Sequence, residues 1–111
     1  MKVLKFGGTS VGSPQRMKEV CNLILEDGQQ KLVVLSAMSG TTNSLVEISQ
    51  YLYSGNEAGA ADVINKLHAK YLAHLPELYA AENIRENVKT FIDEKFEFLH
   101  SFSKEDFTEV E

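Results

Sequence analysis

Apolar residues in the first part of the chain follow two different spacings. Short, mostly apolar runs at residues 3–6 and 31–37 predict two strands, the second around a continuous Leu-Val-Val-Leu core. Between them, an apolar residue recurs every three or four positions, which predicts a helix over residues 14–27 that Gly28 ends. The helical positions are Met17, Val20, Cys21 and Ile24. The order is typical of a βαβ unit, whose strands lie parallel. Because both strands are apolar on both faces, we expect their sheet to be covered on both sides.

After the second strand the pattern becomes helical. Ser44 and Glu47 have the spacing of a capping box, which predicts the start of a helix that Gly55 ends. Two longer apolar stripes predict an antiparallel hairpin, whose first helix is interrupted at Pro76 and whose second helix covers about residues 83–102. The stripe positions are Ala61, Ile64, Leu67, His68, Tyr71 and Leu75, then Ile84, Val88, Phe91, Ile92, Leu99 and Phe102, with Phe96 and Phe98 beside them.

A glycine-rich loop connects the first strand to the first helix. Gly7 and Gly8 follow the strand directly, and we expect them to take positive φ and to let backbone N–H groups approach a phosphate. Ser13 is placed to cap the helix that follows. Lys5 lies within the strand, where a buried ammonium group requires an anion. The alternative is a lysine that extends from the sheet edge into water.

The spacing in this loop differs from that of the two common nucleotide loops. Ser13 and Pro14 stand where a P-loop requires Lys followed by Ser or Thr, and a G-x-G-x-x-G string is absent. The loop after the second strand, residues 36–43, is rich in hydroxyl groups that could bind ligand oxygens, although such residues also make turns and caps. Because the carboxyl ends of parallel strands share one sheet edge, we expect Lys5 and Ser36 to lie in one crevice.

Composition limits the classes of function. The 111 residues are 43% hydrophobic, which suits one globular domain. The net charge of −5 and the lack of any Lys/Arg cluster argue against nucleic acid as a partner. No apolar run approaches the ~20 residues of a membrane span, so we expect no membrane segment and a cytoplasmic protein. Cys21 is expected to pack against the core, and the three histidines, His68, His74 and His100, lack metal-site spacing.

One string identifies a family. Residues 5–11, Lys-Phe-Gly-Gly-Thr-Ser-Val, resemble the start of the aspartate kinases of the amino-acid kinase superfamily, and the resemblance continues at Ser36-Ala37 and at Gly40-x-Thr42-Asn43. It implies an α/β fold, the N-terminal part of a three-layer αβα domain with a parallel sheet. Residues 1–55 would supply its βαβα part and residues 56–103 its helical hairpin. The rest of the domain and the regulatory ACT domains would lie outside this sequence.

The resemblance also implies a reaction, the ATP-dependent phosphorylation of the side-chain carboxylate of L-aspartate to 4-phospho-L-aspartate. This is the first step of lysine, threonine and methionine biosynthesis, and it uses ATP and Mg²⁺ in a cytoplasmic homo-oligomer. Lys5 would be catalytic and would bind the phosphates together with Phe6, Gly7 and Gly8. The substrate-binding candidates are Ser36, beside the transferring group, Thr42, on aspartate, and Ser39. Since the family's later carboxylate, arginine and adenine pocket are missing here, we do not expect the chain alone to be active.

Two other interpretations stay open. The acceptor could be glutamate, acetylglutamate, carbamate or a nucleoside monophosphate, although the Thr-Ser-Val continuation at residues 9–11 and the Thr42-Asn43 pair speak against these. The chain could also be a non-catalytic helical interaction module, which would have no use for Lys5 before two glycines. If the rest of the domain lies outside this sequence, surfaces that its strands and helices would cover stay apolar, so we expect the chain to self-associate or to borrow strands.

Overall fold

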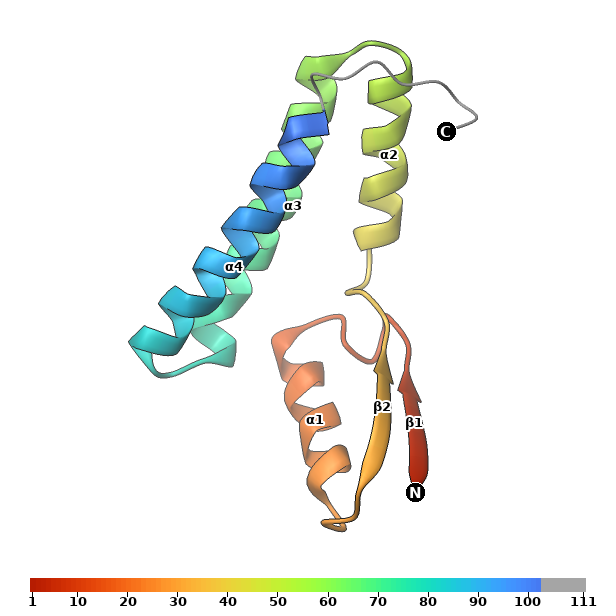
Figure 1. Ribbon diagram of the computed structural model, residues 1–111, viewed down its shortest axis with the longest axis vertical. Helices are drawn as coiled ribbons and strands as arrows, with labels where there is room; N and C mark the ends of the chain where they lie inside the picture. Colours follow the sequence, from red (N-terminus) through yellow and green to blue (C-terminus); the bar gives the residue numbers. More distant parts are fainter. Residues whose placement is uncertain (103–111) are drawn as a thin grey trace. The chain divides into compact units, whose positions relative to one another are not determined.

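The computed structural model of the chain describes residues 1–102. Within these residues, two strands and four helices follow one another (Figure 1), so the α/β class predicted from the sequence is confirmed. The elements are β1 (Lys2–Phe6), α1 (Pro14–Leu25), β2 (Lys31–Leu35), α2 (Thr41–Tyr53), α3 (Glu57–Leu78) and α4 (Glu82–Ser101). The chain divides into two compact units, residues 1–42 and the residues from Asn43 onward. The predicted hairpin boundary at residue 103 lies outside the described residues.

The first unit is the predicted βαβ unit. Strands β1 and β2 pair in parallel, with the register running from Lys2 opposite Lys31 to Phe6 opposite Leu35. Helix α1 begins as its sequence predicts, because the Ser13 hydroxyl accepts a hydrogen bond from the backbone N–H of Arg16 at 3.2 Å. The helix ends at Leu25, and Gly28 follows with a φ of 64°.

The return from α1 to β2 is fixed by a buried lysine. The Lys31 side chain is only 4% exposed, and its ammonium group donates to the carbonyl oxygen of Ile24 at 2.7 Å and pairs with the Asp27 carboxylate. A cation beside the last carbonyls of a helix is favourable. The hydrogen bond from Lys31, followed by those from the Gln29 backbone N–H and from Lys2, holds the pKa of Asp27 well below its usual range. This end of the sheet lies opposite the glycine loop.

One face of the two-stranded sheet is open, so the prediction that both faces are covered is wrong for this chain. Residues on the open face are strongly exposed, for example Val3 at 65% and Leu32 at 54%. Lys5 shares this face, because it alternates with Val3 and pairs in register with Val34. Helix α1 is the only complete helix in this unit and can cover one face. Cys21, expected to pack on that helix, is exposed instead.

The second unit is helical, with a core to which α2, α3 and α4 all contribute. Its buried residues are Ile48, Ala60, Ile64, Leu67 and Phe96. Helices α3 and α4 form the predicted antiparallel hairpin, since Asn65 contacts His100 at one level while His68 contacts Asp93 at another. The Phe96 ring stacks on His68 with the ring centres 4.5 Å apart. Helix α2, which the sequence grouped with the βαβ unit, supplies Ile48 to this core.

Three details of the helices differ from their predictions. Helix α2 begins at Thr41 and not at Ser44, because Gly40 takes a φ of 87° and the Thr41 backbone N–H closes a turn onto the carbonyl of Met38. Helix α3 continues through Pro76 and ends at Leu78, so the proline lies within its last turn. On α4, Phe91 and Phe98 were expected in the buried stripe but are exposed.

Candidate active site

The carboxyl ends of β1 and β2 lie side by side, as predicted. The backbone N–H of Ser36 donates to the carbonyl oxygen of Phe6 at 3.0 Å, which continues the ladder one residue beyond β2. Lys5, opposite Val34, is therefore close to the point where both strands enter their loops. The structure thus brings Lys5, Phe6 and Ser36 to one edge of the sheet.

Lys5 is exposed, and no described residue gives its ammonium group a hydrogen bond or an ion pair. The expectation that a buried run surrounds it is wrong, because the sheet face on which it lies is open. Its charge is therefore available to an anion at the carboxyl edge of the sheet. The other two lysines of β1 and β2, Lys2 and Lys31, are bonded to Asp27 at the opposite end of the sheet. Lys5 is therefore the lysine of this sheet that lies near the loops.

The Gly7-Gly8 loop is compact but not left-handed. The Gly7 carbonyl oxygen accepts a hydrogen bond from the Ser10 backbone N–H at 3.0 Å. Neither glycine has a positive φ, so that part of the prediction is wrong. A Cβ atom on Gly8 would lie 3.0 Å from the carbonyl oxygen of Ala37, whereas a Cβ atom on Gly7 would meet nothing within 4 Å. Gly8 thus allows the two loops to pack together, and Gly7 leaves open space above the backbone.

Gly12 makes a second contact between the two loops, which the sequence did not single out. A Cβ atom there would lie 3.2 Å from the Cβ atom of Ser39 and 3.1 Å from the carbonyl oxygen of Gly8. Loop β1–α1 and loop β2–α2 therefore touch at Gly8 and again at Gly12. The only signal for this contact in the sequence is a third glycine four residues after Gly8, and that spacing does not specify what the glycine packs against.

The hydroxyl-bearing residues of the second loop are placed at its surface. Ser36 and Ser39 are exposed, and Thr42 is exposed in the first turn of α2, whereas Thr41 beside it is buried. Backbone N–H groups in a first helical turn point out of the helix end, where they favour an anion. The predicted substrate residues Ser36, Ser39 and Thr42 thus all belong to the same segment, on the same unit as Lys5 and the glycines.

Carboxylate, imidazole and thiol groups are absent from this edge. Residues 3–13 and 36–43 contain no Asp, Glu, His or Cys. Across the described part of the chain, no three such side chains gather closely enough to hold a metal ion. His68 and His100 are bonded to Asp93 and Asn65, and the Nε2 atom of His74 is buried without a hydrogen-bond partner.

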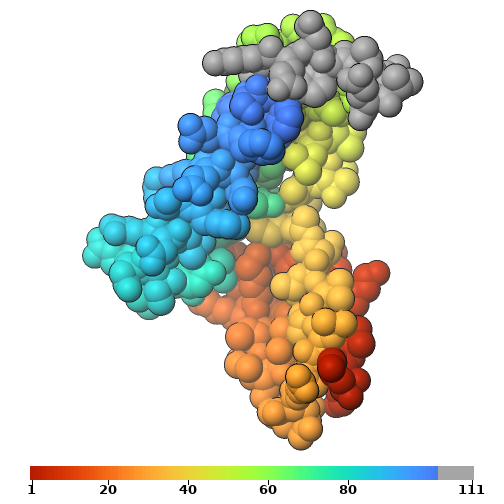
Figure 2. Space-filling view, viewed as in Figure 1, coloured from red at the N-terminus to blue at the C-terminus, as the bar shows by residue number. Residues whose placement is uncertain are grey.

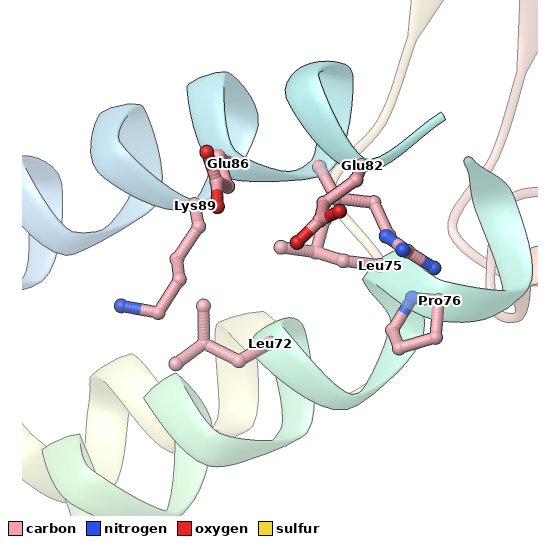
Figure 3. Close-up of a pocket in the computed structure, with 7 residues that line it drawn as sticks. Leu72, Leu75, Pro76, Glu82, Glu86 and Lys89 are labelled. Atoms are coloured by element: carbon pink, nitrogen blue, oxygen red, sulfur yellow. The ribbon is translucent and has the colours of Figure 1, made fainter. Parts of the chain in front are cut away.

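A cavity of about 300 Å³ lies between α3 and α4 in the second unit (Figure 3). Its floor is apolar, formed by Leu72, Leu75 and Pro76, and charged residues of α4 form its rim. Lys89, which extends from α4 toward Leu72, is paired with Asp93 at 2.7 Å. The cavity has no glycine loop, and the Lys89 ammonium at its rim is already paired.

Comparison with known proteins places the first unit and most of the second in one protein family. The sequence profile of the amino acid kinase family matches residues 1–97. The chain belongs to the amino acid kinase family. Membership covers β1 to α4, and it includes every candidate residue named above. In addition, no helix within residues 1–102 combines the length and hydropathy that a membrane-spanning segment requires.

Relatives within the amino acid kinase family include several aspartokinases. The chain is 39% identical over 104 residues to "Aspartokinase 2, chloroplastic" of Arabidopsis thaliana, which is 92% of this chain and 18% of that protein. It is 35% identical over 91 residues to "Lysine-sensitive aspartokinase 3" of Escherichia coli K12, 82% of this chain and 20% of that one. "Aspartokinase" of Geobacillus stearothermophilus is 45% identical over 53 residues, 45% of this chain and 13% of that one. The chain thus spans a fifth or less of these relatives.

Proposed function

We propose that this chain supplies the phosphate-binding edge and part of the aspartate site of a kinase that transfers the γ-phosphoryl group of ATP to the side-chain carboxylate of L-aspartate. The observation that carries the proposal is one sheet edge on which an unpaired Lys5 meets the Gly7-Gly8 loop and the hydroxyl-rich loop after β2. The aspartokinase names of the relatives supply the acceptor. The product would be 4-phospho-L-aspartate, the first intermediate of lysine, threonine and methionine biosynthesis.

Charge is the main obstacle to this reaction. A carboxylate approaching a triphosphate brings several negative charges together, and the nucleophile is already ionised, so no general base is required. Lys5 would neutralise charge that grows on the transferring group. The backbone at Gly7 and Gly8 would hold the phosphate oxygens, because the open space above Gly7 lets a ligand approach the main chain. Phe6 would contribute through its backbone at the end of β1.

The second loop would position the acceptor. Ser36 directly follows β2 and is held to Phe6, so its hydroxyl is the one best placed to lie near the transferring group. Thr42, in the first turn of α2, would contact aspartate, with Ser39 as a second candidate. Contacts that hold the acceptor in line lower the barrier by reducing the entropy lost on reaction. The close packing at Gly8 and Gly12 keeps this loop beside the phosphate loop.

The residues present fit the triphosphate better than the metal. Lysine, backbone N–H groups and hydroxyls all bind phosphate oxygens, but this edge has no carboxylate for Mg²⁺. Mg²⁺, when bound to the nucleotide, neutralises charge on the phosphate oxygens. In this chain it would be held through those oxygens. We propose that nucleotide-base binding and turnover need segments outside the matched part, and that the chain alone is inactive.

Binding can be tested on the chain itself. In amide NMR spectra of the labelled chain, Mg·ATP should shift the signals of Gly7, Gly8 and Ser36, and L-aspartate should shift that of Thr42. The Lys5→Met variant should lose the ATP response, whereas Lys2→Met, on the same strand, should keep it. Shifts confined to the second unit would contradict the proposed site.

Acceptor specificity requires a complete enzyme. The matched segment of the E. coli lysine-sensitive aspartokinase 3 can be replaced by residues 1–97 of this chain. The chimera should release ADP from ATP when L-aspartate is added and not with glutamate, acetylglutamate or carbamate. Preference for one of those acceptors would retain the kinase but overturn the assignment of aspartate.

A further inference from the structure

Gly12 is limited by a side chain of the other loop, and this distinguishes it from Gly7 and Gly8. Its φ is not positive, so the backbone alone does not require glycine at position 12. A Cβ atom there would lie 3.1 Å from the Gly8 carbonyl oxygen, 3.3 Å from the Thr9 carbonyl oxygen and 3.2 Å from the Cβ atom of Ser39. Of these three neighbours, Ser39 alone belongs to the β2–α2 loop. Because this contact is made by a side chain, a second substitution can relieve it.

Position 12 is held firmly by the residues on either side of it. The Gly12 backbone N–H closes a turn onto the Thr9 carbonyl oxygen at 3.3 Å. Val11, one residue earlier, is buried, and Ser13, one residue later, caps α1. A side chain added at position 12 would therefore displace Ser39 before it displaced its own loop.

Ser39 lies at a corner of a tight turn. The Thr41 backbone N–H donates to the Met38 carbonyl oxygen at 3.1 Å, which closes the turn around Ser39. Gly40 has a φ of 87°, a conformation that glycine adopts readily at the third position of a turn. Helix α2 begins at Thr41, so Thr42 lies in the helical turn that directly follows. A displacement of Ser39 is thus passed on to Thr42.

We propose that Gly12 is a positioning residue for the acceptor and that it acts through Ser39. This inference rests on the proposed function, in which Thr42 contacts aspartate. With only hydrogen atoms on the Gly12 α-carbon, Ser39 lies against the phosphate loop, and the turn then sets the distance between Thr42 and the phosphates. Such distances matter, since misplacing a reacting group by about 1 Å can cost roughly a hundredfold in rate.

Ser39 acts in this arrangement as a spacer. A Cβ atom on Gly8 would lie 3.7 Å from the Ser39 backbone nitrogen and 3.8 Å from its α-carbon, which is ordinary van der Waals contact. The Ser39 Cβ atom meets position 12. Main chain and Cβ of Ser39 therefore lie against both glycines, and the spacer role depends on the Cβ atom. Of the two candidates for the aspartate contact, this favours Thr42.

Steady-state kinetics of the aspartokinase chimera tests position 12. Gly12→Val should raise the KM for L-aspartate by about tenfold or more, and Gly12→Ala by a smaller factor, while the KM for ATP changes by less than about threefold. A loss of stability alone lowers the amount of active enzyme and hence the apparent kcat, and it leaves both KM values unchanged. Gln15→Val adds the same side chain at an exposed position of α1, so it is the matched control and should keep the constants of the unsubstituted chimera.

Substitutions at Ser39 test the path of the effect. Ser39→Gly removes the Cβ atom, so adding it to Gly12→Val should lower the aspartate KM again. Ser39→Ala keeps the Cβ atom and removes the hydroxyl group, so adding it to Gly12→Val should give no such recovery. If both double variants recover equally, or neither does, Gly12 does not act through the Ser39 Cβ atom, and the inference is overturned.

The coupling of the loops can also be measured in the 111-residue chain without catalysis. In amide NMR spectra, the mild variant Gly12→Ala should shift the signals of Gly40 and Thr42, whereas Gln15→Val should leave them in place. A working chimera whose aspartate KM is the same with glycine, alanine and valine at position 12 would overturn this inference alone. A chimera without aspartate-dependent ADP release would overturn the proposed function, and the acceptor role of Gly12 with it.

Discussion

The backbone N–H of Ser36 and the carbonyl oxygen of Phe6 are joined by a hydrogen bond of 3.0 Å. This bond lies one residue beyond β2, so it fixes the starting points of both loops relative to each other. The phosphate loop and the hydroxyl loop therefore leave the sheet from adjacent positions. Their contact at Gly8 and Gly12 keeps them adjacent.

The two loop glycines should respond differently to one added methyl group. Gly8→Ala places a Cβ atom 3.0 Å from the Ala37 carbonyl oxygen, and since that oxygen belongs to the backbone and cannot turn away as a side chain would, we expect a loss of about 1–3 kcal/mol in the stability of the first unit. Gly7→Ala meets nothing within 4 Å and should keep or slightly raise stability. Hydrogen exchange of the β1 and β2 amides measures the stability of the first unit in both variants. Equal protection in the two variants would contradict the close loop contact.

Gly7→Ala should nevertheless weaken binding. The added methyl group occupies the open space through which a ligand would reach the backbone. Titration of the folded variant with Mg·ATP should show a higher dissociation constant than the wild-type chain. An unchanged constant would mean that the ligand does not approach at Gly7.

Lys31 should matter far more to the first unit than Lys2, although both contact Asp27. Lys31 is buried and bonded to the Ile24 carbonyl at 2.7 Å, so Lys31→Met should cost about 1.5–3 kcal/mol. The Lys2 side chain is 66% exposed, and Lys2→Met should cost less than about 1 kcal/mol. Urea unfolding, followed through the NMR signals of the β2 amides, measures the stability loss of each variant. Comparable losses would argue against the structural role of Lys31.

Acid should weaken the α3–α4 hairpin through Asp93. Hydrogen bonds from Lys89, followed by that from His68, hold the pKa of Asp93 below its usual value of 3.8. A carboxyl whose pKa is lowered on folding stabilises the folded state above its unfolded pKa, and this contribution is lost as the pH falls through the folded pKa. The hairpin should therefore lose stability below about pH 3.8.

The tyrosines allow this loss to be followed in the second unit alone. All four, Tyr51, Tyr53, Tyr71 and Tyr79, lie after residue 42. Thermal melts monitored by tyrosine fluorescence should show a midpoint that falls in acid for the wild-type chain. Asp93→Asn should lower the midpoint at neutral pH and reduce the acid dependence. A variant with the wild-type pH profile would show that Asp93 does not stabilise the hairpin.

Local signals explain what could be predicted from the sequence. Ser13 caps α1, and Gly28 and Gly55 take the positive φ expected where helices end, because each of these features depends on one or two residues. The parallel pairing of β1 and β2 follows from the short distance in sequence and from the handedness of βαβ units. The shared edge of Lys5 and Ser36 follows from that pairing.

Features that depend on contacts between distant residues could not be predicted. The need for glycine at position 8 comes from Ala37, not from the backbone angles of the loop. The burial of Lys31 depends on the carbonyl of Ile24. Periodicity placed Phe91 and Phe98 on the buried stripe of α4, but α3 covers only the face centred on Phe96. The spacing of apolar residues indicates which face of a helix is apolar, but it does not indicate which element packs against that face.

Turnover of the Lys5→Met variant in the aspartokinase chimera is the most direct test of the proposed chemistry. Loss of one contact to developing charge typically costs ~3–4 kcal/mol of barrier, so aspartate-dependent ADP release should fall roughly a hundred- to thousandfold at saturating ATP. The denaturation midpoint should change little, and Lys2→Met should keep its rate. If the folded Lys5→Met chimera turns over within about threefold of the unsubstituted chimera, Lys5 does not bind the transferring phosphoryl group.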